Sequence, residues 1–176
     1  GVLTGVSEGR TYIELKQSGT DNTQLIIVEV LKEGQIAKPQ VKTNGSHTII
    51  LKANGTVWSF GQNTYGQLGD GSYVAKDGTV KVSFEENTKI TQIDAGREHN
   101  IALDTEGNVW TWGRNSNGQL GVSGSTSNVP VKVNIPEKVV KVAAGNNYSL
   151  AIGESGTAYG CGFNENGELG IGTYKN

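Results

Sequence analysis

The feature that most constrains the fold is a residue pattern that occurs three times along the chain. Each copy has an apolar segment, a turn ending in glycine, a second segment ending in glycine, and the motif Gly-Gln/Glu-Leu-Gly. The apolar segments are His47–Leu51, His99–Leu103 and Tyr148–Ile152, and the motifs are Gly66–Gly69, Gly118–Gly121 and Gly167–Gly170. The spacing is about fifty residues, since the second segments end at Gly61, Gly113 and Gly162. Units of this length cannot bury their apolar faces alone, so the copies must stack side by side.

Within each copy the sequence predicts short antiparallel strands. In the first copy His47, Ile49 and Leu51 share one face, because side chains alternate along a strand. Turns are predicted at dipeptides that supply a positive φ, namely Asn54-Gly55, Glu106-Gly107 and Ser155-Gly156.

The remaining repeated glycines and leucines are also given structural roles. The first glycine of each Gly-Gln/Glu-Leu-Gly motif is expected in a tight turn, and the leucine is expected to anchor its loop against the sheet. We further expect left-handed backbone at Gly96 and Gly145, with Asn44 tolerated at the same position of the first copy.

The second copy resembles the repeats of the regulator of chromosome condensation family. The resemblance lies in Ala95-Gly96 with His99, in Trp112-Gly113 with Asn115, and in Gly118-Gln-Leu-Gly121. It implies a β-propeller of four-stranded blades, usually seven. We therefore predict an all-β chain with a partial β-propeller over residues 39–176. Its three four-stranded blades are placed at 39–89, 90–138 and 139–176, so the ring would be completed by residues outside this chain or by other chains.

The first 38 residues do not follow the repeat. Thr11–Leu15 and Gln24–Val30 are predicted to be two strands joined by the polar turn Ser18–Asn22. Residues 2–13 resemble the last hairpin of bacterial immunoglobulin-like domains of group 2. We expect a β-hairpin or partial immunoglobulin-like segment at 1–31 and a linker at 32–38. Together with the propeller repeats, this resemblance implies an extracellular or cell-surface protein of a Gram-positive bacterium.

Composition disfavours two classes of partner. The formal net charge is −2 and the arginines are only Arg10, Arg97 and Arg114, so there is no basic cluster for nucleic acid. No apolar run reaches the length of a membrane helix, so we expect no membrane insertion. The chain begins without Met and is interpreted as a processed or trimmed fragment. Cys161 is the single cysteine; it is expected to fill a small buried space.

No set of residues predicts catalysis, a cofactor or a metal. His47 and His99 occupy one repeat position, where the third copy has Tyr148, so we expect imidazoles that pack and bond to backbone within their own blade. They lack the further ligands of a zinc site. Alternation places Glu98 on the face opposite His99, which disfavours an acid–base pair. Asp70-Gly71-Ser72 resembles part of a calcium loop, but no acidic ladder follows it.

The binding residues stay unassigned at this point, and three functions stay open. Trp58, Trp110 and Trp112 are expected in the core, with an aromatic platform for peptide or sugar as the alternative. Tyr73–Lys89 and Val122–Pro136 are read as loops suited to interaction. The first hypothesis is a non-catalytic adhesion or protein-binding scaffold. One alternative is a structural subunit that self-associates by strand exchange. The other is an inhibitor of a secreted enzyme, because the family that the repeats resemble includes such an inhibitor.

Overall fold

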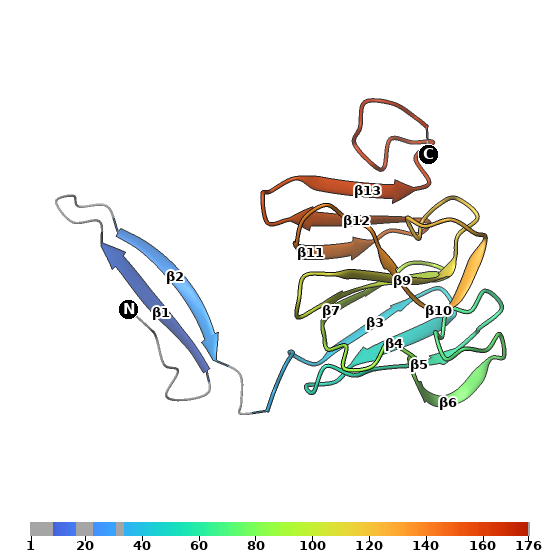
Figure 1. Cartoon of the computed structure of the whole chain (residues 1–176), viewed down its shortest axis with the longest axis horizontal. Helices are drawn as coiled ribbons and strands as arrows, with labels where there is room; N and C mark the ends of the chain where they lie inside the picture. Colours follow the sequence, from blue (N-terminus) through green and yellow to red (C-terminus); the bar gives the residue numbers. More distant parts are fainter. Residues whose placement is uncertain (1–8, 17–22, 31–33, 176) are drawn as a thin grey trace. The chain divides into compact units, whose positions relative to one another are not determined.

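A computed structural model describes residues 9–16, 23–30 and 34–175, with only the backbone in the first two ranges. The chain divides into two compact units, 1–35 and 36–176 (Figure 1). Every regular element in the described ranges is a β-strand, which confirms the all-β prediction. The described part of the chain has no helix long and apolar enough to cross a membrane.

The first unit contains the two predicted N-terminal strands. β1 (Gly9–Lys16) and β2 (Thr23–Val30) pair antiparallel in an unbroken register from Gly9 opposite Val30 to Lys16 opposite Thr23. The predicted turn Ser18–Asn22 lies outside the described residues. The immunoglobulin-like character of this unit stays a prediction.

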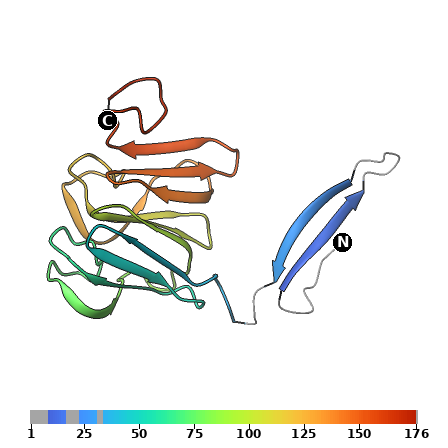
Figure 2. The same cartoon turned by 180° about the vertical axis from the view of Figure 1, so that it is seen from behind.

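The second unit is a stack of three antiparallel sheets, visible from both sides in Figures 1 and 2. Blade 1 consists of β3 (Gln40–Asn44), β4 (His47–Leu51), β5 (Val57–Gly61) and β6 (Lys76–Lys81). Blade 2 consists of β7 (Ile90–Ala95), β8 (His99–Asp104), β9 (Val109–Arg114) and β10 (Thr126–Val133). Blade 3 consists of β11 (Val139–Ala144), β12 (Tyr148–Gly153) and β13 (Ala158–Gly162). The first strands β3, β7 and β11 contact one another from blade to blade.

The fourth strands β6 and β10 lie inside the two segments that the sequence suggested were loops. That reading of Tyr73–Lys89 and Val122–Pro136 is therefore wrong over the central part of each segment. Both strands are outer strands that are mostly exposed or half-buried, so they lack the apolar alternation of a buried strand. Gly78 and Pro130 also lie within them, and each pairing has a register shift, as is typical of sheet edges.

The predicted hairpin turns are confirmed, but the expectation for Gly96 and Gly145 is wrong. The turn glycines Gly55, Gly107 and Gly156 have φ values of 77°, 86° and 86°. Neither Gly96 nor Gly145 is among the positive-φ residues. A Cβ on Gly96 would lie 2.1 Å from Cε1 of His99, and a Cβ on Gly145 would lie 2.1 Å from Cε1 of Tyr148. At these two positions the ring three residues later packs directly on the backbone and leaves no room for a Cβ.

Two apolar clusters lie in the seams between consecutive blades. The cluster between blades 1 and 2 contains the buried indoles of Trp110 and Trp112, with Phe84 packed edge-on at 5.9 and 5.5 Å between ring centroids. The cluster between blades 2 and 3 is built from smaller side chains around Ile101 and Val142. The core position expected for Trp110 and Trp112 is thus confirmed.

Two glycine variants test how closely the strands must approach. Gly113 has a φ of 102°, and a Cβ there would lie 2.5 Å from the carbonyl oxygen of Glu98. Gly118 has a φ of 79°, and a Cβ added there would have no neighbouring atom within 4 Å. We expect Gly118→Ala to lower the free energy of unfolding by about 1 kcal/mol, the cost of left-handed backbone. Gly113→Ala should cost roughly 3 kcal/mol or more, because backbone atoms must move. Urea unfolding of both variants measures the difference, and equal losses would contradict it.

Candidate functional site

A chain of buried hydrogen bonds joins blade 1 to blade 2. His47 Nε2 lies 2.7 Å from Asn100 Oδ1, and Asn100 Nδ2 donates to the main-chain oxygen of Gln67 at 2.8 Å. Trp112 Nε1 donates to that same oxygen at 3.0 Å. Because the Asn100 amide nitrogen faces a carbonyl, its oxygen must accept, so the proton of His47 is on Nε2.

The seam between blades 2 and 3 repeats this arrangement with different side chains. His99 Nε2 lies 3.0 Å from Ser149 Oγ, which donates to the main-chain oxygen of Gln119 at 2.8 Å. The Ser149 hydroxyl has one proton, so His99 Nε2 donates to Ser149. Cys161 Sγ lies 3.5 Å from the same Gln119 oxygen. The expectation of bonds to backbone within one blade is corrected here: each histidine bonds to a side chain of the next blade.

Both histidines are held neutral by their surroundings. Burial, with a smaller contribution from the neighbouring His47, lowers the pKa of His99 to about 4. Burial also lowers the pKa of His47. The described residues contain no group of three His, Cys, Asp or Glu side chains that could hold a metal ion. These imidazoles therefore act as fixed donors between blades.

Glu98 and His99 have separate environments, as alternation predicted. His99 is buried in the seam, whereas Glu98 forms an ion pair with Arg114, with Oε2 and Nη1 2.5 Å apart. The Arg114 guanidinium also lies 4.8 Å from the ring centroid of Tyr65 in blade 1. Glu98 is thus paired with a guanidinium and not with the His99 imidazole.

A buried asparagine braces the loop that follows the third strand of every blade. In blade 1, Asn63 Oδ1 accepts from the backbone N–H of Leu68 at 2.9 Å, and Nδ2 donates to the carbonyl oxygens of Ser72 and Val74 at 3.0 and 3.2 Å. Asn115 and Asn164 make the equivalent bonds in the other blades. Each of the three asparagines lies two residues after the glycine that ends the second segment of its copy, and the sequence pattern predicted no role for them.

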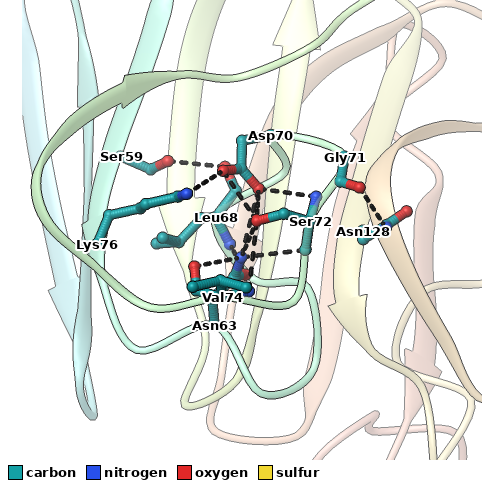
Figure 3. Close-up of polar contacts among 9 residues, drawn as sticks. All are labelled: Ser59, Asn63, Leu68, Asp70, Gly71, Ser72, Val74, Lys76 and Asn128. Atoms are coloured by element: carbon teal, nitrogen blue, oxygen red, sulfur yellow. Dashed lines mark hydrogen bonds and ion pairs between the residues drawn. The ribbon is translucent and has the colours of Figure 1, made fainter.

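The Asp70 carboxylate completes the brace in blade 1 (Figure 3). It accepts hydrogen bonds from the backbone N–H and hydroxyl of Ser72 at 2.9 and 2.8 Å, and Lys76 Nζ lies 4.0 Å away. Burial opposes ionisation of Asp70, but the bonds from Ser72 and Asn63 outweigh it and lower its pKa. The carboxylate is thus used within its own loop.

The same loop is also hydrogen-bonded to the neighbouring blade. Gly71 and Asn128 of β10 exchange two hydrogen bonds, Gly71 N–H to Asn128 O at 2.9 Å and Asn128 Nδ2 to Gly71 O at 2.8 Å (Figure 3). The loop is consequently held at both ends, by Asn63 in its own blade and by Asn128 in the next one.

These braced loops expose large hydrophobic side chains. Tyr73 and Val74 are 52% and 64% exposed in blade 1, and Ile171 and Tyr174 are 60% and 74% exposed in blade 3. Each tyrosine follows its bracing asparagine by ten residues, and Ser125 occupies that position in blade 2. Because both loops follow the third strand of a blade, they lie at the same end of the stack (Figure 1). We call these two loops, one with Tyr73 and Val74 and the other with Ile171 and Tyr174, the tyrosine loops.

The tryptophans do not form the alternative aromatic platform. Trp110 and Trp112 are buried in the seam. Trp58 is half-buried, and the Lys52 ammonium lies 3.9 Å from its ring centroid. The exposed aromatic surface is therefore provided by tyrosines that the repeat pattern did not single out.

Comparisons with protein families and known sequences agree with this architecture. The Regulator of chromosome condensation (RCC1) repeat matches residues 54–103 and 106–152, and a second description of the same repeat matches 40–67, 90–119 and 139–168. The human Regulator of chromosome condensation is 38% identical over 100 residues, covering 54% of this chain and 24% of that protein. The Arabidopsis thaliana Ultraviolet-B receptor UVR8 is 35% identical over 86 residues, covering 49% of this chain and 20% of the receptor. The chain thus spans a quarter or less of these relatives.

Solved structures with the same fold are similar over most of the chain. Prp20p from Saccharomyces cerevisiae superposes with a TM-score of 0.71 at 24% identity, covering 78% of this chain and 36% of Prp20p. Human WBSCR16 superposes with a TM-score of 0.72 at 20% identity, covering 86% of this chain and 39% of that protein. At this level of identity the likeness concerns the fold.

The buried imidazole of His99 predicts a pH dependence of stability. Above pH 6.5 the side chain is neutral in both the folded and unfolded states, so its contribution is fully present. As the pH falls from 6.5 towards 4, the unfolded state binds the proton first, and the free energy of unfolding should fall by on the order of 3 kcal/mol. Urea unfolding over this range measures the slope.

His99→Gln is the matched control, because glutamine keeps an N–H donor and does not titrate. Its stability should change less steeply with pH than that of the unmodified chain, whatever its absolute stability. An unchanged slope would show that His99 does not carry the effect.

Proposed function

Because the chain belongs to the family of regulator of chromosome condensation repeats, we propose that it is a non-catalytic protein-binding scaffold that engages its partner through the tyrosine loops. The observation that carries this proposal is the pair of exposed tyrosines on loops braced by Asn63 and Asn164. Binding residues typically lie on loops positioned by a rigid scaffold.

The energetics of such a surface favour a protein partner. Tyrosine supplies large contact area with few rotatable bonds, and it is enriched among residues that dominate binding energy. A loop already fixed by buried hydrogen bonds loses little conformational freedom on association. Prp20p was studied for its binding properties to Gsp1p and histones, and yeast RCC1 was solved bound to Kap60, so related propellers bind proteins.

We propose that the protein lies outside the cell, secreted or at the surface of a Gram-positive bacterium. The support is the resemblance of residues 2–13 to bacterial immunoglobulin-like domains, in tandem with propeller repeats. We also propose that nucleic acid is not the partner. The support is the formal net charge of −2 and the scarcity of arginine, which provide no basic cluster for phosphate contacts.

A second candidate, self-association by strand exchange, is favoured by the edge of blade 3. Its sheet has the order β11-β12-β13, so among the described residues β13 pairs on one side only. The outer flanks of the stack also expose apolar residues: Val41 is 65% exposed and Ile152 is 42% exposed, whereas the matching Ile93 and Leu103 are buried. An open edge of this kind accepts a strand from another chain.

The protein-binding proposal predicts that the two tyrosines share one partner. Tyr73→Ala combined with Tyr174→Ala should weaken capture of a discrete protein from the extracellular and cell-wall fractions of the source organism by at least roughly tenfold. Val140→Ala is the matched control, because Val140 is 56% exposed outside these loops, and it should leave capture unchanged. Immobilised variants and quantitative mass spectrometry give the comparison. Equal capture by all variants would refute the role of the tyrosine loops.

Strand exchange predicts a concentration-dependent mass. Light scattering of the full chain should show oligomers that grow with concentration, because each open edge can pair with another copy. Replacing Tyr159 of β13 with proline should suppress them, since proline cannot continue a sheet ladder. Thr79→Pro serves as the control, because it lies in β6, the outer strand of a blade that already has four strands. A strict monomer at high concentration excludes this candidate.

A further inference from the structure

The two seams of the stack have matching polar bonds but unequal apolar filling. Trp112 lies opposite Asn100 in the register of blade 2, and Cys161 lies opposite Ser149 in that of blade 3. Both reach the main-chain oxygen of the preceding motif, Trp112 at Gln67 and Cys161 at Gln119. A thiol therefore stands where the other seam has an indole.

A second replacement enlarges the difference. Phe84 packs edge-on against the tryptophans of the first seam and lies two residues after Val82. In the second seam, Ile135 lies two residues after Val133, which pairs opposite Val109. Isoleucine thus stands where the first seam has a phenyl ring. The second seam therefore lacks two aromatic rings that the first seam has, and the smaller Cys161 and Ile135 stand in their places.

The space they leave is a cavity of about 180 Å³ between blades 2 and 3. Its walls include Ile101, Val109 and Leu120 of blade 2 and Tyr159 and Cys161 of blade 3. The residues lining it have no charged side chains. A pocket of this volume is large enough for a benzene-sized molecule, and most of its lining is apolar.

Hydrogen bonds keep the walls of this cavity apart. The Tyr159 hydroxyl donates to Glu137 Oε1 at 2.8 Å, and Glu137 also accepts from the Ser155 backbone N–H and hydroxyl at 2.8 and 2.7 Å. On the other side, the bond from Ser149 to Gln119 fixes the distance between the blades. Tyr159 therefore cannot swing into the cavity without leaving its carboxylate partner.

We propose that this cavity binds one small, uncharged, planar aromatic molecule of the size of benzene or indole. The first seam indicates the shape of this ligand, because the same place there is occupied by an indole ring edge-on to a phenyl ring. A charged ligand is excluded by the cost of moving charge into an apolar space without a partner. The site is independent of the tyrosine loops and of their protein partner.

Indole is the probe for the test, and Cys161 is the reporter. Titration of the full chain by calorimetry should give saturable binding with one site per chain. At indole concentrations ten times its dissociation constant, modification of Cys161 by a thiol reagent should slow about elevenfold, because only the free protein reacts. Tryptamine, which adds an ammonium group to the same ring, should bind at least roughly tenfold more weakly. Absence of saturable binding, or equal binding of tryptamine, would overturn the proposal.

Filling variants locate the site. Cys161→Trp should abolish indole binding, whereas Cys161→Ala, which leaves the cavity open, should retain it. Ile135→Phe fills the cavity from the opposite wall and serves if Cys161→Trp does not fold; circular dichroism and cooperative unfolding verify the fold of each variant. Binding that persists in both folded filling variants would place the indole elsewhere and refute the proposal.

Discussion

The stack depends on one main-chain carbonyl in each Gly-Gln-Leu-Gly motif. The oxygens of Gln67 and Gln119 are reached in each case by two donors of the following blade, and a neutral histidine orients one of those donors. A buried carbonyl without partners would cost about 1–3 kcal/mol, so the seam is stable only when donor and acceptor blades meet in register. The glycines that flank the motif make the sharp turns that present this oxygen to the neighbour.

The sequence was sufficient for the repeats, for the first three strands of each and for their hairpin turns, because these depend on local period and on positive-φ glycines. It failed where the cause lies in another repeat or in solvent. β6 was missed because an exposed outer strand needs no apolar alternation. The partner of His47 is a side chain of the next blade, 53 residues later, which no local pattern reveals. Gly96 was misread because the ring of His99, and not the turn, demands glycine.

In the candidate site, too, the sequence predicted what depends on local pattern and missed what depends on distant parts of the chain. The position of Asn63 is repeated in all three copies, but its role requires knowing that the chain returns to place the Ser72 and Val74 carbonyls beside it. Tyr73 and Tyr174 escaped notice because blade 2 has Ser125 at that position, so they do not follow the repeat. The shared positions maintain the scaffold, whereas the positions that differ between copies provide surfaces and cavities that distinguish one blade from the next.

The seam chemistry has a direction: the leading blade supplies the main-chain carbonyl and the imidazole, and the blade that follows supplies the side chains that bond to both. The two outer flanks of the stack are therefore unlike. Blade 3 presents the motif Gly167–Gly170, which contains Glu168. Blade 1 presents Thr48 and Phe60, which lie opposite each other in the register of β4 and β5. A contact between the blade 3 flank of one copy and the blade 1 flank of the next is therefore head to tail. Such a heterologous contact closes into a ring when its rotation divides the circle, and otherwise it propagates as a helical filament.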